Sequence, residues 1–140
     1  MKLSRFTRSA LGTLIWSEND WSNMYESDNP RPFLDDAPGT HYANGADVPI
    51  DDFDFDEEGL LEFSRDCESF WSAVIDLGLS SHGETEQYAD DFVLTRNGHG
   101  AGFWDGDWPA PADTKLTAIS KTYGNVSLYR GDDGRIYFSG

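Results

Sequence analysis

The chain has 140 residues and a formal net charge of −16, with 38% apolar and 14% aromatic residues. This length suits one domain, and the aromatic bulk is enough for a core, which excludes wholesale disorder. The single cysteine, Cys67, excludes an internal disulfide and a cysteine-based zinc site, and it is expected to be a buried thiol. We therefore expect a single domain, residues 1–140, that carries no metal and no cofactor.

The negative charge is concentrated in the middle of the chain. Residues 1–16 carry three bases and no acid (+3), residues 17–90 carry twenty acids and two bases (−18), and residues 91–140 carry six acids and five bases (−1). Such a field repels nucleic acid and anionic membranes, whereas it attracts a basic protein. We therefore expect no direct binding to nucleic acid and none to membranes.

The N-terminal part predicts a helix followed by an irregular segment. Residues 1–16 have a short apolar run that Gly12 and Thr13 interrupt, which favours an amphipathic helix over a signal sequence or a membrane span. Residues 17–56 are rich in Ser, Asn, Asp, Gly and Pro and have no sustained period. Their aromatic side chains indicate an acidic irregular wrap pinned to the core rather than a free tail.

Residues 57–79 predict a long amphipathic helix. Apolar residues recur at helical spacing, and most acidic residues fall on the opposite side. Asp56 suits the N-cap, Glu57 and Glu58 suit the positive end of the helix dipole, and Gly78 suits the C-terminal stop.

Residues 88–140 predict a ββαββ unit. Asn97-Gly98 is a hairpin signal because both residues tolerate positive φ, and Asp133-Gly134 offers a second turn. The expected elements are strands at 91–96 and 100–105, a helix at 112–123 and a last hairpin. The fold class is therefore α+β: a four-stranded antiparallel sheet from two β-hairpins, packed with the long helix, after an irregular Trp-rich N-terminal third.

An acidic run from Asp51 to Glu58 holds six carboxylates in eight residues. A calcium loop of EF-hand type is excluded, because Glu57 stands where that loop needs glycine and Phe63 where it needs a bidentate glutamate. Three interpretations stay open: the solvated start of a helix, weak binding of divalent cations by the clustered carboxylates, and carboxylates that imitate DNA phosphates at a basic protein surface. The candidate partner-binding residues are Asp51, Asp52, Asp54, Asp56, Glu57, Glu58, Glu62 and Asp66.

A cluster of Gly, His and Trp at residues 98–108 is the alternative site. Histidine titrates near neutrality, and indole rings stack on bases, sugars or cations. The glycines resemble a phosphate-binding loop in composition only, because a strand rather than a helix is expected after them. This site would make the chain a small-ligand or nucleotide-binding protein or an enzyme, and its candidate residues are Arg96, His99, Trp104 and Trp108.

Two stretches, DDFVLTRNGHGAGFWDGDWP (residues 90–109) and LTAISKTYGNVSLYRGDDGRIY (residues 116–137), resemble a family of small uncharacterised proteins from tailed bacteriophages and prophages. The likeness is close over residues 91–137 and looser elsewhere, and Val93 stands where the family pattern has Trp. The family brings no activity with it. The resemblance implies a phage origin and a location in the cytoplasm of the infected bacterial host.

The charge and the resemblance together predict a non-enzymatic phage accessory protein. It would inhibit a host defence or DNA-processing protein, as anti-CRISPR or anti-restriction proteins do, through an acidic surface that imitates DNA or otherwise attracts the target. The expected partner is a basic host protein, either a nucleic-acid-binding complex or a nuclease. A minor structural or assembly protein of the virion stays open as another alternative, and the oligomeric state is not predicted.

Overall fold

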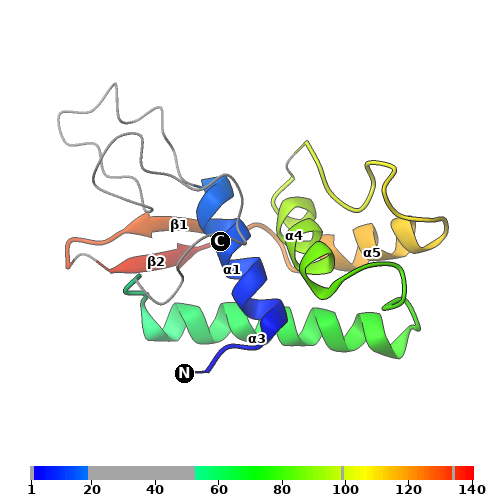
Figure 1. Ribbon diagram of the computed structural model, residues 1–140. Helices are drawn as coiled ribbons and strands as arrows, with labels where there is room; N and C mark the ends of the chain where they lie inside the picture. Colours follow the sequence, from blue (N-terminus) through cyan, green and yellow to red (C-terminus); the bar gives the residue numbers. More distant parts are fainter. Residues whose placement is uncertain (1, 19–52, 99, 134) are drawn as a thin grey trace.

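The computed structural model describes residues 2–18, 53–98, 100–133 and 135–140. Helix α3 runs along one side of the molecule, with the β-hairpin near its N-terminal end, α4 and α5 near its C-terminal end, and α1 between them (Figure 1). The described elements are α1 (Arg5–Glu18), α3 (Glu57–Asp76), α4 (Thr85–Arg96), α5 (Ala112–Lys121), β1 (Ser127–Arg130) and β2 (Ile136–Ser139).

The expected four-stranded sheet is wrong. The described residues form one two-stranded antiparallel sheet, in which Ser127 of β1 pairs with Ser139 of β2, and Arg130 pairs with Ile136. The second predicted hairpin is thus confirmed, and no first hairpin exists among the described residues. Phe55 forms an isolated parallel bridge with Ile136, so the segment just before α3 is attached to the edge of β2.

Helix α4 replaces the first predicted hairpin. Residues 91–96, expected as a strand, form the second half of α4, and residues 100–105 form turns and bends. Gly98 has a φ of +71° and directly follows Asn97, the C-cap residue of α4. The Asn97-Gly98 pair therefore ends a helix, because a glycine with positive φ serves a helix C-terminus as readily as a hairpin turn.

One signal for α4 lies upstream of the turn. The backbone N–H of Glu84 donates to Oε1 of Gln87 at 2.7 Å, as in a capping box at the helix start. The aromatic and β-branched residues after Asp91 favour a strand locally, but burial on one helical face outweighs that preference. The buried residues of α4 are Tyr88, Ala89, Phe92, Val93, Thr95 and Arg96.

The other predicted helices are confirmed. The carboxylate of Asp56 caps α3 by accepting from the N–H of Gly59 at 2.9 Å, and Gly78 follows the helix with a φ of +72°. Helix α5 lies within the predicted range 112–123, and α1 lies where an N-terminal helix is expected. Most of the irregular segment expected over residues 17–56 falls outside the described residues.

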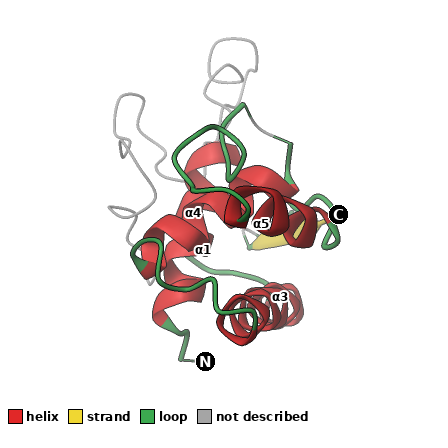
Figure 2. Ribbon diagram, turned by 90° about the vertical axis from the view of Figure 1, so that its right-hand side faces the viewer, coloured by secondary structure: helices red, strands yellow, loops and turns green. Residues whose placement is uncertain are grey.

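An aromatic cluster joins three helices in the core. The ring of Phe70 on α3 stacks on Phe92 of α4 with centroids 4.3 Å apart, and it also contacts Phe6 of α1 and Phe103. All four rings are buried. Figure 2 shows α1 and α4 together above α3. The core is therefore mainly helical, and α3 packs against it with one side of the helix.

Candidate functional site

The outer side of the first half of α3 carries uncompensated acids. Phe63 and Cys67 point into the core, whereas Glu57, Glu58 and Glu62 are exposed. Within the described part of the chain, these three glutamates form no ion pair with Lys or Arg. We refer to Glu57, Glu58 and Glu62 as the acidic face, and its charge is free to attract a partner.

The other acids of the predicted partner site have different surroundings. Asp54 Oδ2 lies 3.6 Å from Arg135 Nε, in a pair that solvent screens because both side chains are exposed. Asp56 is engaged as the N-cap of α3. Asp51 and Asp52 lie outside the described residues. In the predicted set, Asp54 and Asp56 therefore have local contacts, and Asp51 and Asp52 have no described position. Three further members form the acidic face.

Asp66, the last residue of that set, is partly exposed and contacts the buried Arg96 in a polar cluster. Its Oδ2 lies 3.1 Å from Nη2 of Arg96, whose side chain is only 3% exposed. Arg96 also donates from Nε to the carbonyl of Gly124 at 2.8 Å and from Nη2 to the carbonyl of Tyr123 at 3.1 Å. Its guanidinium carbon lies 5.3 Å from the ring of Phe92, within range of a cation–π contact. Arg96 therefore ties α3, α4 and the segment after α5 together.

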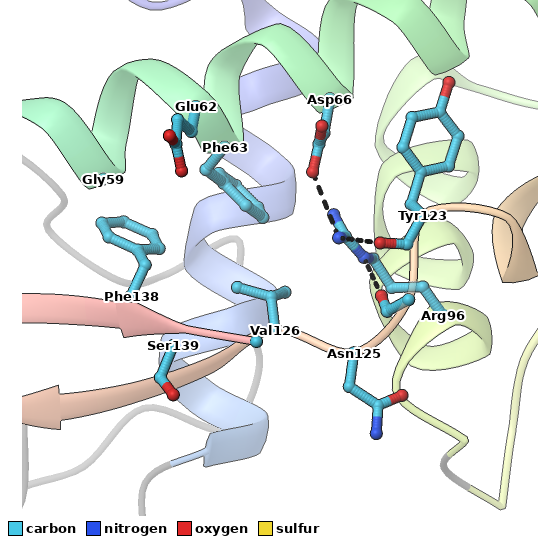
Figure 3. Close-up of a pocket in the computed structure, with 12 residues that line it drawn as sticks. Gly59, Glu62, Phe63, Asp66, Arg96, Tyr123, Asn125, Val126, Phe138 and Ser139 are labelled. Carbon is cyan, nitrogen blue, oxygen red and sulfur yellow. Dashed lines mark hydrogen bonds and ion pairs between the residues drawn. The ribbon is translucent and has the colours of Figure 1, made fainter.

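A cavity of about 310 Å³ opens between α3 and β2, beside this cluster (Figure 3). We refer to it as the α3–β2 cavity. Glu62 of the acidic face stands at its wall together with Asp66 and Arg96, and the rings of Phe63 and Phe138 stack with centroids 5.7 Å apart. The remaining lining comes from Gly59, Tyr123, Gly124, Asn125, Val126, Ser139 and Gly140.

A second cavity of about 510 Å³, the α4 cavity, lies on another side of α4 and contains an unusual carboxyl group. The pKa of Asp91 is raised to about 6, mainly because the carboxyl group is buried. The negative charges of Asp105, Asp90 and Asp107 raise this pKa further. The indole N–H of Trp108 donates to Oδ2 of Asp91 at 2.6 Å and has the opposite effect. The lining residues are His82, Gln87, Asp90, Asp91, Asp107 and Trp108.

The residues of the alternative ligand site do not meet in one cavity. Arg96 lines the α3–β2 cavity and Trp108 lines the α4 cavity, while Trp104 is an exposed side chain. His99 lies outside the described residues. Sequence reasoning missed Asp91, because its contact with Trp108 depends on how the loop after α4 folds back. The sequence signal was a pair of adjacent acids, Asp90 and Asp91, directly before the apolar residues Phe92 and Val93.

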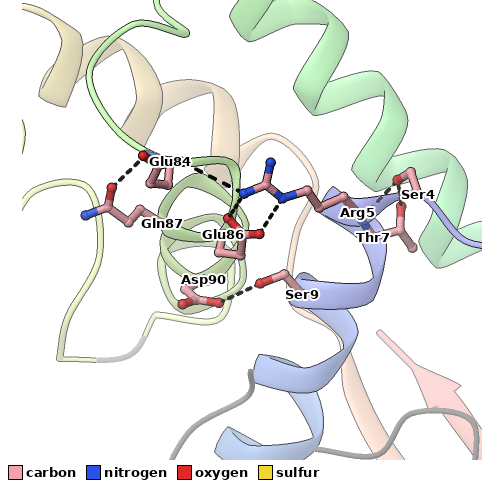
Figure 4. Close-up of polar contacts among 8 residues, drawn as sticks. All are labelled: Ser4, Arg5, Thr7, Ser9, Glu84, Glu86, Gln87 and Asp90. Atoms are coloured by element: carbon pink, nitrogen blue, oxygen red, sulfur yellow. Dashed lines mark hydrogen bonds and ion pairs between the residues drawn. The ribbon is translucent and has the colours of Figure 1, made fainter. Parts of the chain in front are cut away.

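The contact between α1 and α4 uses acids structurally (Figure 4). Glu86 of α4 forms a hydrogen-bonded ion pair with Arg5 of α1, which lowers the pKa of Glu86 and raises the pKa of Arg5. The Oγ of Ser9 donates to Asp90 Oδ1 at 3.3 Å, and Thr13 donates to the same oxygen. Burial raises the pKa of Asp90, and these donors partly offset the effect. The acids at this contact are thus already engaged.

Metal and thiol chemistry find no support in the described residues. In the parts of the chain that the structure covers, no three or more His, Cys, Asp or Glu side chains gather where they could hold a metal ion. Cys67 is a free buried thiol, as expected, and burial raises its pKa well above the ordinary value, which leaves it protonated and unreactive. None of the described helices has the length and apolar character needed to cross a membrane.

Comparisons with protein-family models, with curated proteins and with solved structures find no match to this chain.

Proposed function

We propose that this protein is a phage accessory protein that binds a basic host protein of defence or DNA processing and inhibits it by covering its nucleic-acid-binding surface. The acidic face carries this proposal, because Glu57, Glu58 and Glu62 project from a long helix that the core holds in place. A fixed array of like charges accelerates encounter with an oppositely charged surface. The resemblance to phage proteins supports action in the cytoplasm of an infected bacterium.

The charge density of α3 favours attraction over close imitation of DNA. The helix carries six acids and one base, a net charge of −5 over its 20 residues. At 1.5 Å of rise per residue these charges spread over about 30 Å, or about one per 6 Å, whereas duplex DNA has one per about 1.7 Å. The acidic face is therefore suited to occupy part of a basic surface rather than to replace a duplex along its length.

An apolar side chain among the acids adds a short-range contact. Leu61 is 39% exposed and lies in the sequence between Glu58 and Glu62. Charges at an interface mainly set the encounter rate and the specificity, whereas desolvated apolar anchors slow dissociation. Leu61 supplies such an apolar anchor next to the charges of Glu58 and Glu62.

The test removes charge from the acidic face and from a matched position elsewhere. The double variant Glu58→Gln/Glu62→Gln is compared with Asp76→Asn/Asp132→Asn, which changes the net charge equally at exposed acids away from that face. Each protein is produced in a bacterium that carries a restriction or CRISPR system, and the plating efficiency of a sensitive phage is measured. Wild type and the control pair are expected to restore plating, whereas the acidic-face pair restores it poorly.

Binding provides the second measurement. The host protein captured by wild type is expected to be basic, to bind the acidic-face variant roughly tenfold more weakly, and to dissociate more readily at high salt. If no defended strain changes its plating, inhibition of host defence is the wrong function. If the two double variants bind the target equally well, the acidic face is not the binding surface.

The α4 cavity supports a second candidate, the binding of a small ligand or an enzymatic reaction. A carboxyl group with a pKa near 6 in a cavity is typical of catalytic and binding sites. Thermal unfolding with and without nucleosides, sugars and amines tests this candidate. A stabilising compound whose effect disappears in Asp91→Asn would favour it, and no shift with any compound would count against it.

A further inference from the structure

The α3–β2 cavity has the size of a receptor for a single side chain. Its volume of about 310 Å³ lies at the lower limit of ligand pockets, which span about 300 to 1,000 Å³. It adjoins the acidic face, since Glu62 belongs to both. A partner held on the acidic face would therefore have this cavity within reach.

The charges around the cavity favour a cation. Glu62 and Asp66 contribute two negative charges and Arg96 one positive charge, which leaves a net charge of −1. Arg96 is already held by Asp66 and by the carbonyls of Tyr123 and Gly124, so its charge is compensated. An incoming phosphate or carboxylate would face Glu62 without a free counter-charge, and the cavity is thus poorly suited to anions.

Free hydrogen-bonding groups remain in the wall of the cavity. The described contacts of Asp66 use Oδ2, which leaves Oδ1 as an acceptor, and Glu62 has no ion-pair partner in the described residues. Nη1 of Arg96 is buried and has no acceptor among those residues. A ligand with several donors would satisfy the two carboxylates, whereas Nη1 is covered by the protein and is not accessible to a ligand.

The rest of the wall suits an aliphatic stem and a planar cation. Phe138, which is partly buried, supplies apolar surface along which a long side chain can pack, and the more deeply buried Phe63 and Val126 also line the cavity. Aromatic rings at the same wall attract a guanidinium through cation–π contacts. A guanidinium presents five N–H donors in one plane, which match paired carboxylates better than an ammonium does.

From these features we propose that the α3–β2 cavity binds one arginine side chain of the basic partner. The guanidinium donates to Glu62 and Asp66, and the stem packs on Phe138. The identity of the occupant as part of a protein rests on the function proposed above. The preference of the cavity for an arginine side chain does not depend on that function.

The test is an NMR titration of the full chain with N-acetyl-arginine N-methylamide. We expect saturable binding in the millimolar range, with shifts concentrated at the backbone amides of Gly59, Gly124 and Val126. The neutral citrulline analogue, which has nearly the same shape, is expected not to bind, and the lysine analogue is expected to bind more weakly. Glu62→Gln should weaken arginine binding about tenfold, whereas the matched charge removal Asp76→Asn should leave it within about twofold.

The proposal is overturned if the citrulline or lysine compound binds as tightly as the arginine compound, or if the shifts do not map to the cavity. The titration needs no host protein, so its outcome is independent of the proposed function. If the arginine compound binds but no defended strain responds, the cavity assignment stands and the inhibitor function falls. If the arginine compound does not bind while the acidic-face variant loses its target, the cavity assignment falls and the inhibitor function stands.

Discussion

The contact between α1 and α4 and the acidic face of α3 use carboxylates in opposite ways. At the helix contact, Glu86 meets Arg5, and Asp90 accepts hydrogen bonds from Ser9 and Thr13. On the acidic face, the three glutamates have no cationic partner in the described chain. The acids behind the net charge of −16 therefore fall into two groups. Some form ion pairs or hydrogen bonds within the fold, whereas others have no cationic partner among the described residues and can attract a positive charge at a distance.

Asp66 marks the border between these two groups. It lies one helical turn from Glu62, on the same helix, yet it forms an ion pair with the buried Arg96, whereas Glu62 does not. A comparison of these neighbours separates an acid that is paired within the fold from an acid that has no cationic partner in the described residues.

The largest expected effect comes from the core that supports both regions. Phe70→Ala removes a ring that contacts α1 and α4, and it should lower the free energy of unfolding by about 3 to 5 kcal/mol. Denaturant titration measures this loss, with Leu61→Ala, at an exposed position of the same helix, as the control. A loss below about 1 kcal/mol would contradict the placement of Phe70 at the centre of the core.

The next effect sharpens the contrast between Asp66 and Glu62. Asp66→Asn leaves the buried Arg96 without its counter-charge and should destabilise the protein by about 2 kcal/mol, less than a fully buried pair because Asp66 is partly exposed. Glu62→Gln should change stability by less than about 0.5 kcal/mol. Equal losses for the two variants in denaturant would remove the distinction drawn between these acids.

A smaller effect concerns pH. The pKa of Asp91 is about 6 in the folded protein and near 3.8 in the unfolded chain, so the folded state binds this proton more tightly. The stabilising contribution is complete below about pH 4 and is lost as pH rises through about 6. Partial exposure reduces the change to roughly 1 to 2 kcal/mol.

The measurement compares denaturant unfolding of wild type and Asp91→Asn from pH 4 to pH 7. Every other group titrates in both proteins, so their difference reports Asp91. Wild type is expected to lose stability relative to the variant over this range. Parallel curves would show that Asp91 titrates as an ordinary exposed carboxyl group.

The smallest effect belongs to the exposed pair of Arg5 and Glu86. Arg5→Gln should lower the melting temperature slightly at low salt and not measurably at high salt, because solvent and ions screen exposed charges. Thermal unfolding at two salt concentrations checks this. A large loss that does not depend on salt would mean that the α1–α4 contact relies on this pair far more than its exposure implies.

Helix ends were predictable where the signal is local. Asp56, Glu57 and Glu58 identified the start of α3, and Gly78 its end, because capping depends on residues within one turn. The same local signals were ambiguous at Asn97-Gly98. Positive φ at a glycine permits either a hairpin or a helix end, and the capping contact of Glu84 with Gln87 lies between the predicted helix at 57–79 and the predicted unit at 88–140, where no element was expected.

The sequence by itself determined the location of the acidic segment, the long amphipathic helix and the final hairpin, because each depends on neighbours close in the chain. Only the tertiary structure decided that α4 is a helix, that Asp91 meets Trp108, and that Asp66 but not Glu62 is paired. Asp66 and Glu62 were predicted from the sequence as equal members of one partner-binding set. Their difference arises because folding brings Arg96, thirty residues further along the chain, against one of them.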